Sequence, residues 1–109
     1  MRSMTVENEG DSLAVIFLDS SISEEVRIME IGDDLAEIAS KIPAGQALTL
    51  SFQNVEYFSS AMVGQLVRLR NTIKKCGVEM RLRHLSPTIQ AILRAMHLEN
   101  VFRIENSNA

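Results

Sequence analysis

The sequence predicts a single α/β domain over residues 1–109, built on a mixed, mostly parallel sheet covered by helices. Apolar runs typical of strands alternate with helical patterns in the order β-β-α-β-α-β-α-β, and parallel neighbours require such crossover connections. The length is that of one domain, and a hydrophobic content of 46% supports a true core. Because tryptophan is absent and aromatic residues make up only 5%, we expect that core to be mainly aliphatic.

The first two strands are expected to form an antiparallel hairpin. Residues 13–18 are a continuous apolar run, as in a strand buried on both faces, and residues 4–7 form a weaker edge strand before it. The turn residues 9–11 separate the two. A helix follows, starting at Ser23 or an earlier serine and ending before Pro43. Its apolar positions recur at spacings of three and four: Ile28, Ile31, Leu35, Ile38, Ala39 and Ile42.

Three strands and two helices complete the predicted order. Residues 47–52 form an apolar strand, and a helical pattern runs from about residue 61 to residue 75, where Gly77 suits the end of a helix. Residues 78–83 alternate between apolar and polar, as a half-buried strand does. Ser86 and Pro87 suit the N-cap and the first position of a third helix. Residues 101–104 then indicate a last short strand.

The composition argues against several classes of partner. A formal net charge of −3, with no aromatic residues interleaved among the cations, does not favour direct binding to nucleic acid. No apolar run is long enough to cross a membrane, and no signal-peptide core is visible. One cysteine excludes an intramolecular disulfide. We therefore expect a cytoplasmic protein without membrane insertion.

Catalytic and metal-binding motifs are missing from the sequence. His84 and His97 stand apart, with no carboxylate or cysteine at a spacing suited to a metal. There is no glycine-rich phosphate loop, no GxSxG elbow and no CxxC pair. We therefore expect no enzymatic activity, no metal and no cofactor.

Two adjacent serines, Ser59 and Ser60, lie where the strand at residues 47–52 passes into the second helix. A hydroxyl at such a junction can cap the helix, or it can be a modification site, because the first N–H groups of a helix lack internal partners. A helical projection places Ser60, Gly64 and Arg68 on the polar face. Gly64 could serve close packing of helices or close approach by another protein.

The serine junction resembles the signature of STAS domains, the family of bacterial anti-sigma-factor antagonists. That signature reads valine, any residue, phenylalanine, an apolar residue, Asp-Ser-Ser-Gly and Leu-Gly. In this chain the stretch reads Val55-x-Tyr57-Phe58-Ser59-Ser60-Ala61-Met62-Val63-Gly64. Ser86-Pro87 and Phe102-x-Ile104 are similar to the family's serine-led helix and Phe-x-Ile strand. The resemblance implies the STAS fold.

The resemblance also implies a function. Such a domain binds an anti-sigma factor that has serine kinase activity, and so regulates transcription indirectly. Phosphorylation of the serine at Ser60 ends this binding, and a PP2C-type phosphatase restores it. Ser59 stands where the family has aspartate, which makes it an alternative acceptor. The partner-binding residues are expected to be Ser59, Ser60, Ala61, Met62, Gly64 and Arg68.

A second function remains open at this point. Some STAS domains are not phosphorylated and act as scaffolds, or as subunits of a signalling or transporter-associated complex. Since Ser59 replaces the family's aspartate, this sequence is compatible with that role as well.

Overall fold

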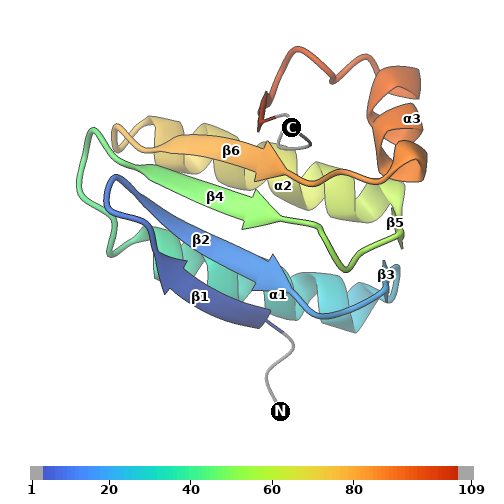
Figure 1. Ribbon diagram of the computed structural model, residues 1–109, viewed down its shortest axis with the longest axis horizontal. Coiled ribbons are helices and arrows are strands. Elements are labelled where there is room, and N and C mark those ends of the chain that lie inside the picture. The colour runs from blue at the N-terminus through green and yellow to red at the C-terminus, as the bar shows by residue number, and fades with distance from the viewer. Residues whose placement is uncertain (1–3, 106–109) are drawn as a thin grey trace.

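A computed structural model describes residues 4–105 of the chain. It contains a five-stranded sheet in the order β1-β2-β4-β6-β7, in which β1 is antiparallel to β2 and all other neighbours are parallel (Figure 1). This confirms the predicted mixed, mostly parallel sheet. The strands are β1 (Met4–Asn8), β2 (Ser12–Phe17), β4 (Ala47–Ser51), β6 (Glu79–Arg83) and β7 (Arg103–Glu105).

Residues 4–105 include three helices, two of which cover one face of this sheet. The helices α1 (Glu25–Ala39) and α2 (Ser60–Lys74) run side by side behind it, whereas α3 (Pro87–Ala95) lies beyond the ends of the strands (Figure 1). Ser86 caps α3 through a bond from the Ile89 N–H to its Oγ, as predicted. The first helix, however, has Glu24 and not Ser23 at its N-cap. None of the helices described is long and apolar enough to cross a bilayer.

The core lies between the sheet and the two long helices. Alternate residues of the central strands, such as Val15, Leu50 and Leu82, face the helices and are fully buried. At one end of this core the rings of Phe17 and Phe52 lie 5.1 Å apart, and those of Phe52 and Phe58 lie 5.4 Å apart edge to face. The core is therefore aliphatic along most of its length but aromatic at the end where the strands stop, a concentration that composition alone could not reveal.

Arginine side chains cover the face of the sheet that lacks helices. Thr49 is buried on this face although no helix covers it, and its Oγ1 lies 2.6 Å from the Oγ of Ser12. Arg83 donates hydrogen bonds to Glu9 at 2.8 Å and to Glu105 at 3.2 Å. Ion pairs thus connect the tip of the first hairpin to β6 and β7, and they shield small buried side chains beneath.

The pair of Glu9 and Arg83 predicts a loss of stability in acid. A hydrogen bond from Arg83 holds the pKa of Glu9 below its ordinary value of 4.5. A carboxyl whose pKa is lowered on folding stabilises the protein above its unfolded pKa, and that contribution is lost as the pH falls through the folded value. Urea unfolding should therefore show the wild type losing stability below about pH 4.5 more steeply than Glu9→Gln. Equal pH profiles for the two proteins would contradict this assignment.

Candidate functional site

The serine junction lies at the carboxyl ends of the strands, where both long helices begin (Figure 1). Two short strands that the sequence pattern did not predict, β3 (Ser21–Ile22) and β5 (Tyr57–Phe58), pair here in parallel. The Ser59 N–H also donates to the carbonyl of Ile22 at 3.0 Å. This small ladder ties the start of α2 to the segment that precedes α1.

The segment leading to the serines is held from several sides. Phe58 is fully buried and Val55 nearly so. The Asn54 side chain donates to the carbonyl of Phe17 at 3.0 Å, and the Ser86 hydroxyl donates to the carbonyl of Glu56 at 2.8 Å. The serines are thus presented on a supported backbone and not on a loose loop.

Ser59 is the N-cap residue of α2 by position, but its side chain does not cap the helix. Its carbonyl accepts the N–H of Met62 at 3.0 Å. Its Oγ is buried and has no hydrogen-bond partner among residues 4–105. The N–H groups of Ser60 and Ala61 likewise have no acceptor in the described part of the chain. The first turn of α2 therefore has backbone N–H groups that are available to donate hydrogen bonds to a ligand or a modifying group.

Two serine-to-alanine substitutions should have contrasting effects on stability. Ser86→Ala removes both the cap on α3 and the bond to Glu56, so we expect a cost of about 1–2 kcal/mol. Ser59→Ala removes only an unpaired buried hydroxyl, so the free energy of unfolding should stay within about 0.5 kcal/mol of the wild type or rise. Denaturant melts of both variants test this. A large loss in Ser59→Ala would show that its hydroxyl caps the helix after all.

Ser60 occupies the first position of α2 and is exposed to solvent. The positive end of the helix dipole and the unused N–H groups both favour an anion at this place. A phosphate on Ser60 would therefore be compatible with the helix. The Oγ of Ser59, by contrast, is inaccessible in this conformation.

The other predicted partner-binding residues divide into exposed and buried ones. Ala61 and Arg68 are exposed on the outer side of α2, and Gly64 is partly exposed there. Arg68 donates to the Gln65 side chain at 3.0 Å. Met62 is completely buried, so its assignment to the partner surface was wrong: its side chain points into the core.

Gly64 is not a helix-packing glycine, because a Cβ atom at this position would meet no atom within 4 Å. Gly64→Ala should therefore stabilise the isolated protein by about 0.5–1 kcal/mol, since alanine is the better helix former. The same methyl group should weaken binding if a partner approaches the α2 backbone there. For this variant, thermal melting should thus give a higher melting temperature than the wild type, and binding titration should give a lower affinity. A destabilised Gly64→Ala protein would contradict the open geometry.

Gly32 has the packing role that Gly64 lacks, a role that was not predicted from the sequence. A Cβ at Gly32 would lie 2.5 Å from the Nε2 of Gln65. That amide nitrogen donates to the carbonyl of Ile28 at 3.2 Å and so joins α2 to α1. An isolated glycine within a helical pattern was the available signal of a close approach.

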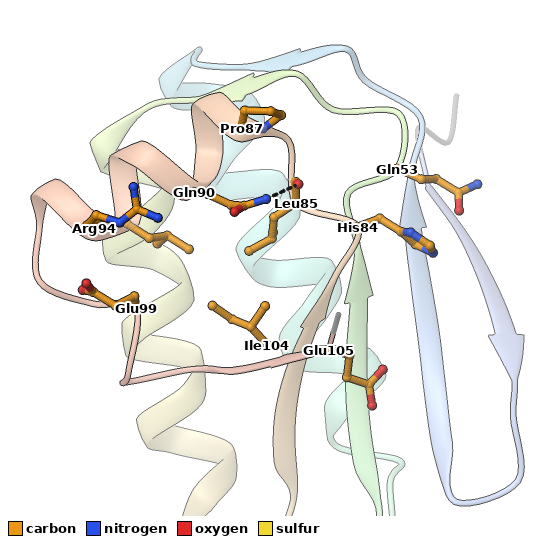
Figure 2. Close-up of a pocket in the computed structure, with 10 residues that line it drawn as sticks. Gln53, His84, Leu85, Pro87, Gln90, Arg94, Glu99, Ile104 and Glu105 are labelled. Carbon is orange, nitrogen blue, oxygen red and sulfur yellow. Dashed lines mark hydrogen bonds between the residues drawn. The ribbon is translucent and has the colours of Figure 1, made fainter. Parts of the chain in front are cut away.

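A separate hollow of about 670 Å³ lies between α3 and β7. Its polar side chains do not converge: Figure 2 shows His84 and Gln53 on one side and Arg94 with Glu99 on the other. Within residues 4–105, no group of three or more histidine, cysteine, aspartate or glutamate side chains could hold a metal ion.

Comparison with models of protein families identifies one family. The family model described as "STAS domain" matches residues 11–109 of this chain. An anti-sigma-factor antagonist (STAS) domain protein from Planctomyces limnophilus superposes with a TM-score of 0.85 at 19% identity, covering 97% of this chain and 91% of that one. An anti-sigma factor antagonist from Mycobacterium paratuberculosis gives 0.73 at 17% identity, with 93% and 82% covered.

The anti-sigma factor antagonist SpoIIAA in its unphosphorylated form is also similar in structure. It superposes with a TM-score of 0.72 at 15% identity, covering 96% of this chain and 88% of that one. No curated protein matches the chain significantly in sequence. At these identities the solved structures establish the fold, and the family follows from the match over most of the chain.

Proposed function

Because the chain belongs to the STAS domain family, we propose that it is an anti-sigma-factor antagonist controlled by phosphorylation of Ser60. It would bind an anti-sigma factor that has serine kinase activity, release the sigma factor and so regulate transcription from the cytoplasm without contacting nucleic acid. The observation that carries this proposal is the exposed hydroxyl of Ser60 at the start of α2, beside backbone donors that no described residue occupies.

Phosphorylation would act on the partner interface and not on the fold. A phosphate adds a charge of about −1.5 to −2 at neutral pH. The N-terminus of α2 can accommodate that charge, because its dipole and N–H groups favour anions. A partner packed on the same surface would have to desolvate the phosphate or meet it with new cations. Binding should therefore be lost while the domain remains folded, and a PP2C-type phosphatase would restore it.

Burial favours Ser60 over Ser59 as the acceptor. A kinase must bring the γ-phosphate in line with the attacking hydroxyl, which requires an accessible oxygen. Ser60 is exposed, whereas the Oγ of Ser59 is enclosed. Ser59 becomes the alternative only if the junction opens in the kinase complex.

The proposal is tested by titrating the protein with the anti-sigma-factor kinases of its own organism, using calorimetry, with light scattering to define the complex. We expect one of them to bind stoichiometrically. If none binds and the protein instead forms stable assemblies that Ser60→Asp leaves intact, it is a non-phosphorylated scaffold or a subunit of a larger complex.

A further inference from the structure

The first two turns of α1 expose two large apolar side chains. Val26 is 69% exposed and Met29 is 63% exposed. They are three residues apart and therefore neighbours on the helix surface. Neither contributes to the core, which α1 reaches through Ile28 and Ile31. Valine is also a weaker helix former than alanine or leucine, so local structure does not account for it.

Met29 of this pair lies near the side of α1 that contacts α2, and Val26 lies about 60° further round the helix towards solvent. Both helices begin at the same end of the sheet (Figure 1), and the Gln65 side chain of α2 bonds to the carbonyl of Ile28. Gly32 faces Gln65, and helical geometry places Met29 about 60° further round from Gly32, towards solvent. Met29 therefore lies on the solvent side of the contact between α1 and α2, and Ala61 of α2 is exposed as well.

The surroundings of the pair are acidic. Four exposed carboxylates of this region form no ion pair among residues 4–105: Glu24, Glu25, Asp33 and Asp34. Arg27, the nearest cation in sequence, pairs with Asp19 at 3.1 Å. A protein that covers Val26 and Met29 must therefore bring positive charge to this rim, because burying these carboxylates unpaired would be costly.

We propose that Val26 and Met29 are the apolar anchor of the partner interface, and that the partner presents an apolar pocket rimmed by lysine or arginine. The two side chains project from α1, whereas Ala61 and Gly64 of α2 have little or no side chain to project. Val26 and Met29 would thus lie in the partner's pocket, and the partner's backbone would come close to α2 beside Ser60. This inference rests on the proposed function and adds α1 to the binding surface.

A matched pair of double variants tests the anchor. Val26→Ala/Met29→Ala removes the proposed anchor, and Val6→Ala/Met96→Ala removes the same side chains at exposed positions on β1 and at the end of α3. Calorimetric titration with the anti-sigma factor that binds the wild type should show an affinity loss of about tenfold or more for the first variant. The second should remain within about twofold of the wild type. Circular dichroism confirms that both are folded.

A second arm tests the charge of the partner. Wild-type affinity should fall as salt is raised, and Glu25→Gln/Asp33→Asn should reduce that dependence. Equal affinities of the two double-alanine variants would overturn the apolar anchor, and binding independent of salt would overturn the cationic rim; either result would leave the proposed function intact. Failure of the wild type to bind any anti-sigma factor would overturn both.

Discussion

Replacing Ser60 by aspartate is expected to weaken binding to the anti-sigma factor by about 100-fold or more. Ser60 is exposed at the start of α2. Its neighbours on this surface, Ala61 and Gly64, have small side chains or none, so a partner can approach the helix closely. A carboxylate enclosed there without a cation costs several kcal/mol, and each 1.4 kcal/mol is about a tenfold change in affinity. The same carboxylate should stabilise the free domain slightly, by about 0.3–1 kcal/mol, because it lies at the positive end of the helix dipole.

The neutral control for this substitution is Ser60→Asn, which has nearly the shape of aspartate but no charge. Calorimetric titration should show a much smaller loss for Ser60→Asn, and thermal melting should show that Ser60→Asp is at least as stable as the wild type. If both variants lose affinity equally, bulk and not charge is responsible. If Ser60→Asp is destabilised, the helix start does not accept an anion as its geometry indicates.

Replacing Phe52 by alanine is expected to be the most destabilising of these substitutions, at about 3–5 kcal/mol. Its ring is 1% exposed and lies between those of Phe17 and Phe58. Removing it leaves a cavity between β2 and the segment that supports the serines, and it breaks both ring contacts. Since domains of this kind are stable by about 5–15 kcal/mol in total, the loss would be a large part of the whole.

Tyr57→Ala is the control for Phe52→Ala, because Tyr57 is an aromatic residue of the same segment that is 42% exposed. Urea unfolding should give a much smaller change for it. Comparable losses in the two variants would mean that the aromatic cluster does not carry the stability of this end of the core.

The elements with strong periodic or apolar patterns could be predicted from the sequence. The strands β2 and β4 are marked by continuous apolar runs, as expected for strands that are buried. Ser86 and Pro87 mark the start of α3, because serine suits the N-cap and proline the first position of a helix. The end of α2 was likewise marked by Gly77, whose φ of 77° suits glycine. In each case the signal lies in neighbouring residues.

The features that were missed depend on residues far apart in the chain. The strands β3 and β5 have two residues each and exist only because they pair with one another. The ion pairs across the open face join Glu9 to Arg83, 74 positions away. Within the candidate site, the helical projection placed Ser60, Gly64 and Arg68 on the polar face of α2, and the structure leaves Ser60 and Arg68 exposed and Gly64 partly exposed. Met62 is buried because it lies on the apolar side of α2, which a match to the family signature does not reveal.

The most direct test of the proposed function is to incubate the protein with its anti-sigma-factor kinase and ATP, and to map the product by mass spectrometry. We expect one phosphate on Ser60, none in Ser60→Ala, and loss of the complex once the phosphate is present. Recovery of the complex after treatment with a PP2C-type phosphatase completes the cycle. A protein that binds this kinase but acquires no phosphate on Ser60 or Ser59, or that still binds when phosphorylated, would contradict the switch.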